Sequence, residues 1–356
     1  MTQERSTEAE AEARDAFTSF AGLVRARVET ELVRIFDEET IAAKADGSSS
    51  AVVIDALRQI TMRGGKRLRP ALLGVGFIAA GGEADDRTIA VAGAALELLQ
   101  SYLLIHDDWM DESVLRRGGP TAHVLLRGAF GDASSASGAV LAGDYGSALS
   151  QRVILEVPGA PDRVLAASRL LARVHGEVVR GQVLDMFDRL GDVRAVEHRY
   201  ALKTASYTVS GPLAMGALLA GGNALAVSLE PIGRAVGVAF QLQDDLLGLF
   251  GAEASMGKSV GTDLRDGKGT WITTELFRTA EGRALVAQVF GRKDAGTHAV
   301  ENALSVLRDH PAVSACRARI AMLCDEARRA LDSTTITPSA DRLLRGAIDA
   351  LTERDA

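Results

Sequence analysis

The chain has 356 residues, of which 47% are hydrophobic and 24% charged, and its formal net charge is −7. That length allows one large domain or two ordinary ones. The acidic balance argues against a nucleic-acid partner, because no basic face dominates. The two cysteines, Cys316 and Cys324, match neither a metal motif nor a secreted disulfide framework. We therefore expect a globular protein with plain core thiols, located in the reducing cytoplasm.

The first fifteen residues, MTQERSTEAEAEARD, are rich in acidic side chains. They lack the basic start and the apolar run of a signal peptide, so the sequence predicts no export. We expect residues 1–15 to form a charged tail or helix. Residues 16–356 contain no long low-complexity linker and no fixed repeat, which predicts a single domain.

Apolar residues recur at helical spacing along most of the chain, as in AVVIDALRQI (51–60) and AALELLQSYLLI (94–105). Alternating β-branched runs are scarce. The pattern predicts an all-α protein in which ten or more helices surround a central cavity. Turn residues predict helix breaks at 44–50, 81–86, 156–162, 189–192, 221–223, 251–263 and 333–339.

A basic segment, RGGKRLRP, covers residues 63–70. It places Lys66, Arg67 and Arg69 directly after the flexible Gly64–Gly65 pair. The planar arginine fork matches phosphate oxygens, and lysine adds a movable point charge. Ordinary exposed bases would give the same pattern, and for Arg67 we expect only that.

The next charged segment, HDDWMD, contains Asp107, Asp108 and Asp111. Three- and four-residue spacing brings these carboxylates toward one side of a helix, where they would repel one another without a cation. Clustered carboxylates of this kind are typical Mg²⁺ ligands, although a solvated acidic face is the alternative. The apolar run LELLQSYLLIH before the motif favours a buried helix that emerges at a cavity. Arg116 and Arg117 follow closely.

Residues 204–229 carry no charge over 26 positions, long enough to cross a bilayer, which takes about 20 apolar residues. The overlapping stretch of residues 209–231 contains three helix breakers: Pro212, the GGN of residues 221–223 and Pro231. These breakers predict two buried helices joined by a turn, and no transmembrane segment.

A second acidic pair lies 137 residues after the first, in AFQLQDDLLGLFG. Asp244 and Asp245 match the first two aspartates, and Gly248 stands where the third would be. Two inward-facing acidic clusters on separate helices could hold Mg²⁺ between them. Lysines in later segments would complement bound anions: Lys203, Lys258 and Lys268. Carboxylates for metal and bases for anions together indicate a site for diphosphate groups.

Six segments occur in the order GGKRLRP, HDDWMDESVLRRGGPT, GQVLD, KTASY, FQLQDD and GKSVGTDLRDGK. In these six segments and their order, the chain resembles the trans-isoprenyl diphosphate synthases, which are also called the polyprenyl synthetase family. The resemblance implies the isoprenoid synthase fold and a homodimer. It also implies Mg²⁺-dependent head-to-tail condensation of isopentenyl diphosphate with an allylic diphosphate (dimethylallyl, geranyl or farnesyl).

The resemblance also assigns roles to individual residues. It implies three Mg²⁺ ions held by Asp107, Asp111 and Asp244, within clusters that include Asp108 and Asp245. The allylic diphosphate would contact Arg116, Lys203 and Lys258, with Gln241 nearby, and isopentenyl diphosphate would contact Lys66, Arg69, Arg117 and Gln100. The remaining matches to family pocket residues are Gln182, Asp185, Thr204, Tyr207 and Lys268. Thr204 and the carbonyl of Lys203 would stabilise the allylic cation.

Gly248 departs from the full DDxxD form of the second motif. One metal contact is then lost or supplied by another residue, for which Asp263 is the candidate. We interpret the change as a variant of the motif rather than as a sign of inactivity.

Residues one helical turn before Asp107 should lie beneath the motif, at about 1.5 Å of rise per residue. They are Tyr102 and Leu103. In the family, an aromatic residue five positions before the motif resembles the type that stops at C20, so we expect geranylgeranyl diphosphate as the main product. The alternative products are farnesyl diphosphate or a longer chain. The alternative for Tyr102 is an aromatic residue of the core with no role in product length.

Two other classes remain open. A class I terpene cyclase also uses an Asp-rich motif with Mg²⁺, but it needs one diphosphate site, whereas GGKRLRP offers a second. A non-catalytic partner subunit of another synthase would typically lose the aspartate motifs, and this chain keeps the first.

Overall fold

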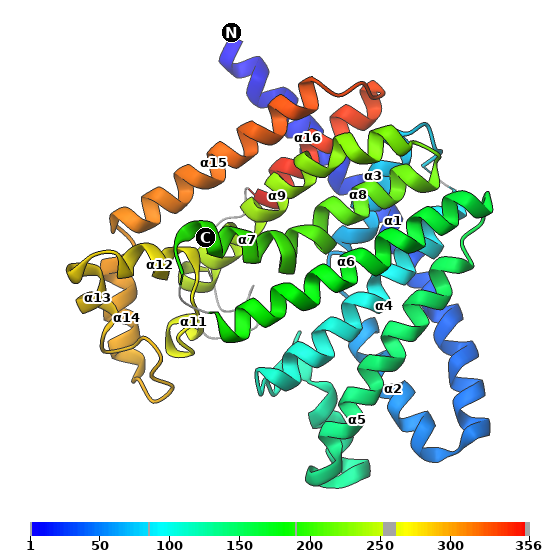
Figure 1. Cartoon of the computed structure of the whole chain (residues 1–356), viewed down its shortest axis with the longest axis horizontal. Helices are drawn as coiled ribbons and strands as arrows, with labels where there is room; N and C mark the ends of the chain where they lie inside the picture. Colours follow the sequence, from blue (N-terminus) through cyan, green and yellow to red (C-terminus); the bar gives the residue numbers. More distant parts are fainter. Residues whose placement is uncertain (1, 85, 189–190, 252–260, 353–356) are drawn as a thin grey trace.

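The computed structural model describes the chain except residues 1, 85, 189–190, 252–260 and 353–356, and except the side chains of residues 2–7 (Figure 1). Helices dominate the described residues, as predicted. The α-helices are α1 Thr2–Asp46, α2 Ser48–Met62, α3 Leu68–Ala79, α4 Arg87–Met110, α5 Ala122–Leu155, α6 Pro161–Phe187, α7 Val193–Tyr200, α8 Gly211–Leu219, α9 Asn223–Phe250, α11 Thr262–Arg265, α12 Trp271–Phe277, α13 Ala280–Val286, α14 Thr297–Leu307, α15 Pro311–Asp332 and α16 Pro338–Thr352. A π-helix, η1 Ala201–Ser210, lies between α7 and α8, and β1 Leu115–Arg116 pairs antiparallel with β2 Gly119–Pro120.

The predicted breaks coincide with helix ends. For example, α1 ends at Asp46 before α2 begins at Ser48, and α8 ends at Leu219 before the turn that leads into α9. Pro231 is an exception, because it lies inside α9 rather than ending a helix. A helical proline frees the carbonyl four residues earlier. That residue is Val227, which is 71% exposed, so water can take the place of the lost backbone partner.

The core forms around α4, whose central residues are almost completely buried. It packs against α3 and α5, while α3 packs on α8 and α9 packs on η1 and α15. α1 and α16 lie together at the edge of the bundle, and α13 and α14 project at the far end from α1 (Figure 1). In addition, α5 contacts α6, and α6 packs on η1.

The boundary expected at residue 15 falls inside α1, which is a single helix of 45 residues. Ala13 is already buried, and a side chain at Gly346 of α16 would collide with the Ala13 carbonyl at 2.0 Å. The charged N-terminal residues from Thr2 onward thus belong to a helix that continues into the core. Cys316 and Cys324 are buried free thiols, as expected.

Among the described residues, α4 and α9 are long and apolar enough to span a membrane by length and composition. Core helices of bundles pass the same test, and 83% of the apolar window of α4 is buried inside the structure. The apolar 204–229 run divides among η1, α8 and the start of α9, as the predicted breakers indicated.

Close backbone approaches hold η1 in place. Gly181 of α6 lies against Lys203, and a Cβ there would come within 2.5 Å of the Lys203 nitrogen. Gly237 of α9 lies equally close to Ala205 on the other side. Because π-helical turns are rare and concentrate at functional sites, this segment marks a candidate site. No sequence pattern used above distinguishes it from an ordinary α-helix.

Candidate active site

The first aspartate motif lies at the C-terminal end of α4. Asp107 is partly exposed, and its Oδ1 accepts a hydrogen bond from Gln182 Nε2 at 3.2 Å. The same oxygen is 3.6 Å from Lys203 Nζ. Burial alone would lower the pKa of the Lys203 ammonium, but nearby carboxylates, Asp107 first and then Asp185, raise it above its usual value. Helices α4 and α6 and the π-helix η1 thus contribute to one charged site.

The second residue of this motif has a different environment. Asp108 is 1% exposed, and Arg116 of β1 donates to both its oxygens, with Nε at 2.8 and 2.7 Å. Arg116 Nη2 is 3.9 Å from Asp107 Oδ2. Burial would lower the pKa of Arg116, yet its bonds to Asp108 raise it. Asp108 therefore orients Arg116 toward Asp107, while Asp111, just after α4, is exposed.

A cavity of about 1110 Å³ opens beside Asp107. Its walls are largely apolar and come from α4, α5 and α6. Tyr102 and Leu103 line it, as the sequence predicted, and the Tyr102 ring lies between two imidazoles, with centroids 4.7 Å from His106 and 5.0 Å from His175. The predicted site residues that also line the cavity are Asp107, Gln182, Lys203 and Tyr207.

The second motif lies in α9, with Asp244 partly exposed and Asp245 buried. Asp245 accepts hydrogen bonds from Tyr200 Oη at 2.5 Å and from Gln241 Nε2 at 3.1 Å. Burial raises the pKa of Asp245 to about 7. Thr204 Oγ1 donates to Gln241 Oε1 at 2.7 Å, so η1 and α9 are joined through one amide.

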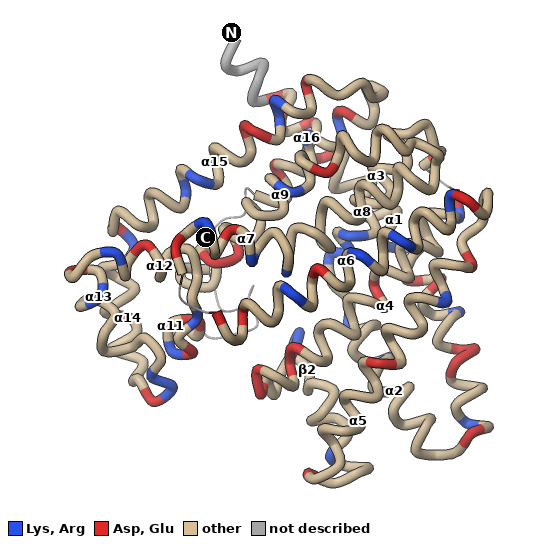
Figure 2. Tube along the Cα trace, in the orientation of Figure 1, with Lys and Arg blue, Asp and Glu red and all other residues tan. Residues whose placement is uncertain are grey.

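Asp263 of α11 occupies the space beside Gly248. A Cβ on Gly248 would lie 2.7 Å from Asp263 Oδ2. Lys268 Nζ is 3.1 Å from Asp263 Oδ1. Burial would lower the pKa of Lys268, but Asp263 and then Asp111 and Asp107 raise it, so Lys268 faces the carboxylates of α11 and of the first motif. Acidic and basic segments gather where α6, α7 and α11 approach one another (Figure 2).

A second cation group lies around α3 and the β1–β2 hairpin. Arg69 stacks on the Tyr207 ring at 4.1 Å and donates from Nη2 to Thr208 Oγ1 at 2.9 Å. Arg117 donates to the Gly64 carbonyl, and a side chain at Gly65 would lie 2.9 Å from the Arg117 guanidinium. Gly65 also has φ +139°, so only glycine fits this contact.

Several charges converge in this second group. Burial lowers the pKa of Arg117 and Glu97 opposes the shift, while three neighbouring cations lower it further: Arg67, Arg116 and Arg69. Among the described residues, Arg69 Nε and Gln100 Oε1 are buried without hydrogen-bond partners. Lys66 is exposed just before α3. Crowded cations together with the unused Arg69 Nε donor favour a bound anion.

The expectation for Arg67 is wrong. Its side chain is 2% exposed, pairs with the buried Glu97 and donates from Nη2 to the Thr61 carbonyl at 2.7 Å. Arg67 has φ 47° at the N-cap of α3, so this pair fixes the strained backbone between Lys66 and Arg69. The acidic partner stands 30 residues away in the chain, and for that reason the local pattern did not reveal it.

Sequence reasoning also missed Arg63 and Arg199. Arg63 donates to the Pro120 carbonyl and, at 3.5 Å, to the Arg116 carbonyl, and it packs against Gly119. It thereby attaches the hairpin that carries Arg116 to the end of α2. Its position directly before Gly64 was the available signal, and for Arg199 the signal was a place four residues before Lys203.

Lys258 lies outside the described residues. Within the described ranges, no three His, Cys, Asp or Glu side chains converge closely enough to hold a metal ion by themselves. Lys203 Nζ lies 3.6 Å from Asp107 Oδ1 and Lys268 Nζ lies 3.1 Å from Asp263 Oδ1, so each of these lysines faces a carboxylate of the expected site.

Comparisons with known proteins agree with this arrangement. The polyprenyl synthetase family model matches residues 50–307. The geranylgeranyl diphosphate synthase of Methanosarcina mazei is 32% identical over 293 residues, 82% of this chain and 86% of that protein. The (2E,6E)-farnesyl diphosphate synthase of Mycobacterium bovis is 38% identical over 224 residues, 61% of this chain and 58% of that protein.

A solved structure extends the likeness to nearly the whole chain. It is the geranylgeranyl pyrophosphate synthase of Corynebacterium glutamicum in complex with isoprenyl diphosphate and magnesium. The TM-score is 0.87 at 28% identity, and the match covers 95% of this chain and 99% of that one. The chain belongs to the polyprenyl synthetase family, with the all-α isoprenoid synthase fold that its motifs predicted.

Proposed function

We propose that the protein condenses isopentenyl diphosphate head-to-tail with allylic diphosphates and releases geranylgeranyl diphosphate as its main product. One observation carries the proposal: two cation groups approach the same apolar cavity, one through Lys203 in its wall and the other through Arg69, which stacks on the wall residue Tyr207. One group, Lys203 with Arg116, lies beside Asp107. The other contains Arg69 and Arg117. A cyclase would need only the first group.

Mg²⁺ fits the acidic side of this site. Its preferred ligands are one or two carboxylates completed by water and substrate phosphate oxygens. The absence of three converging ligand side chains among the described residues agrees with ions that bind together with the diphosphate. Asp107, Asp111 and Asp244 would hold three ions, with Asp263 replacing the carboxylate that Gly248 lacks. When bound, Mg²⁺ neutralises the leaving diphosphate and so favours ionisation of the allylic C–O bond.

The chain's own residues complete this chemistry. Lys203, Arg116 and Lys268 present positive charge where the diphosphate leaves, and such fixed charges lower barriers strongly. Arg69, Arg117 and Lys66 orient isopentenyl diphosphate so that its double bond attacks C1 of the allylic cation. Loss of a proton then restores a double bond in the longer chain.

The allylic cation is stabilised by oxygen dipoles that do not form a bond with it. The Thr204 hydroxyl donates to Gln241, so its oxygen lone pairs remain available to a cation. The backbone carbonyl of Lys203 lies in the same π-helical turn. The apolar cavity walls exclude water, which would otherwise quench the cation.

The product length follows from the cavity. Tyr102 lies one turn below Asp107 and is clamped by His106 and His175, so a growing chain meets an aromatic obstacle at that depth. Leu103 lines the same wall. A single bulky aromatic at this level supports a C20 product over C15, which needs a shorter cavity.

The proposal includes a cytoplasmic homodimer. Large apolar side chains are exposed along α6 at Leu165, Val179, Val183 and Phe187, and on the neighbouring α5 at Leu141. An exposed apolar stripe of this kind supports a protein interface. Two unpaired, buried cysteines agree with a reducing compartment.

Incubation of the purified protein with labelled isopentenyl diphosphate and each allylic diphosphate tests the function. We expect elongation with Mg²⁺ and none with a chelator, and a product of twenty carbons by chromatography. Absence of Mg²⁺-dependent elongation with dimethylallyl, geranyl and farnesyl primers alike would refute the proposal. Formation of a cyclic hydrocarbon without isopentenyl diphosphate would instead identify a cyclase.

A further inference from the structure

The loop between α11 and α12 carries Lys268, whose Nζ lies 3.1 Å from Asp263 Oδ1 and whose charge also faces the first aspartate motif. It spans residues 266–270 and ends at Thr270, which caps α12 by accepting the Thr273 N–H at 3.2 Å. Loops are mobile by default, so a lysine at such a position acts reliably only if the loop is anchored. The anchor comes from the end of α7.

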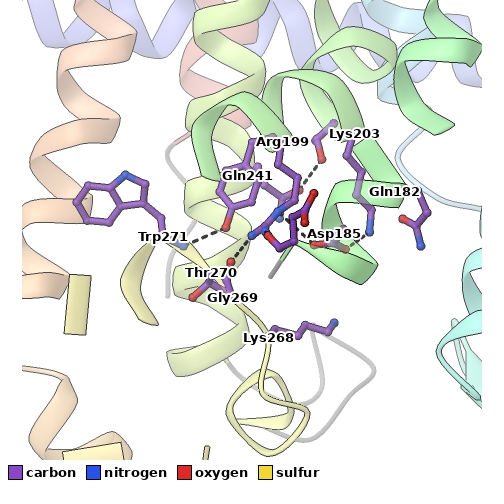
Figure 3. Close-up of polar contacts among 12 residues, drawn as sticks. Gln182, Asp185, Arg199, Lys203, Gln241, Lys268, Gly269, Thr270 and Trp271 are labelled. Carbon is purple, nitrogen blue, oxygen red and sulfur yellow. Dashed lines mark hydrogen bonds and ion pairs between the residues drawn. The ribbon is translucent and has the colours of Figure 1, made fainter. Parts of the chain in front are cut away.

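Arg199 is 4% exposed and contacts three residues from two segments. Its Nη2 donates to the Gly269 carbonyl, directly beside Lys268. Its Nε is 3.3 Å from Asp185 Oδ1, and its Nη1 donates to the Asp188 carbonyl at 3.4 Å. One buried guanidinium therefore joins the loop to the C-terminal part of α6 (Figure 3).

Asp185 transmits this connection to the catalytic side. Lys203 Nζ donates to Asp185 Oδ2 at 2.5 Å, while Arg199 approaches the other carboxylate oxygen. Figure 3 shows Asp185 and Arg199 lying between Lys203 and the loop that carries Lys268. The two lysines that face Asp107 and Asp111 are thus linked through a single carboxylate and a single guanidinium.

Tyr200 adds a second attachment from the same helix. Its buried hydroxyl accepts the Trp271 N–H at 3.1 Å and donates to Asp245. The first residue of α12 and the second aspartate motif are therefore fixed to the same point. Both neighbours at the end of α7 bind the 266–271 backbone, so the anchor does not depend on one bond alone.

We infer that Arg199 is a positioning residue that sets the distance between Lys203 and Lys268, and through them the binding of the leaving diphosphate. This inference rests on the proposed function. The partners of Arg199 are Asp185, Asp188 and Gly269, and none belongs to the Arg69–Arg117 group. Loss of the guanidinium should therefore disturb turnover of the allylic substrate much more than binding of isopentenyl diphosphate.

Steady-state kinetics of Arg199→Gln, with each substrate varied separately, tests the inference. We expect kcat to fall by about tenfold to a hundredfold, as misplaced charge at a reacting group commonly does. KM for isopentenyl diphosphate should stay within twofold of the wild type. Arg199→Lys keeps the charge but cannot reach all three acceptors, so it should recover only part of the loss. The matched control is Arg194→Gln, an exposed arginine on the same helix, which should behave as the wild type.

A double-mutant cycle with Lys268→Ala separates positioning from general loosening. If Arg199 acts through Lys268, the double variant loses less activity than the product of the two single losses. Multiplicative losses, or KM values for both substrates that rise in parallel, would overturn the inference. So would wild-type kinetics in Arg199→Gln. Should that variant fail to fold, the same cycle is measured with Arg199→Lys, for which full activity overturns the inference. A wild-type protein that elongates no primer refutes the proposed function instead.

Discussion

The two aspartate motifs begin alike and end differently. In each, the first aspartate is partly exposed and the second is buried and hydrogen-bonded, Asp108 to Arg116 and Asp245 to Tyr200. The third position is Asp111 in one motif and Gly248 in the other, where Asp263 fills the space from another helix. A carboxylate can therefore reach the third position of such a motif either from the end of the same helix, as Asp111 does, or from another helix, as Asp263 does.

Removal of the first aspartate should have the largest effect. We expect Asp107→Ala to lower kcat by on the order of a thousandfold, because a carboxylate for metal and the partner of Lys203 are lost together. Elongation assays with a geranyl primer measure the loss. Asp55→Ala on the exposed face of α2 is the matched control and should keep full activity. Substantial turnover by Asp107→Ala would contradict the metal role.

Removal of the Asp263 carboxylate, beside the second motif, should lower activity less than removal of Asp107. Asp263→Asn should lower activity by roughly tenfold to a hundredfold, since Lys268 also loses its ion-pair partner. The double variant Gly248→Asp with Asp263→Ala returns a carboxylate to the helix and should recover part of that loss. Full activity in Asp263→Asn, or no recovery in the double variant, would show that Asp263 does not stand in for a third aspartate.

The helices before the two motifs differ as well. Tyr102 stands five residues before Asp107 and lines the cavity, whereas Ala239 stands five before Asp244 and is completely buried in the core. We expect Tyr102→Ala to lengthen the product by at least one five-carbon unit with little change in rate. Product chromatography measures this. Phe240→Leu, beside Ala239 on α9, should leave the length unchanged, and an unchanged product from Tyr102→Ala would remove Tyr102 as an obstacle.

The smallest effect concerns His175, which contacts Tyr102. Burial lowers the pKa of His175 below its usual value of 6.5 in the folded protein. The unfolded chain then binds a proton more readily as pH falls below about 6.5, so stability is lost in that direction. His175→Asn should remove this part of the loss, less than about 1 kcal/mol because solvent still reaches the ring. Melting temperatures of both proteins from pH 8 to pH 5 check the difference, and parallel curves would contradict it.

Much of the fold was predictable because helix breaks are local. The turn residues at 44–50 and 221–223 lie where helices end. The motifs likewise predicted that Asp107 and Lys203 share one site, and the structure places Lys203 Nζ 3.6 Å from Asp107 Oδ1. What the sequence did not reveal depends on contacts between distant residues. Arg67 pairs with Glu97, 30 residues away, and Arg199 reaches Gly269, 70 residues away, only after the helices have packed.

The π-helix η1 makes the length of one segment a constraint in its own right. A π-helical turn closes on the fifth residue instead of the fourth, so η1 holds more residues per turn than an α-helix. Deletion of a single residue from Ala201–Ser210 would rotate α7 relative to α8 by the rotation of one π-helical residue, which is less than the about 100° of an α-helix. Arg199 and Tyr200 would then face away from the loop that they anchor, although every side chain named in the site would still be present in the chain. Residue count, as well as residue identity, aligns this site.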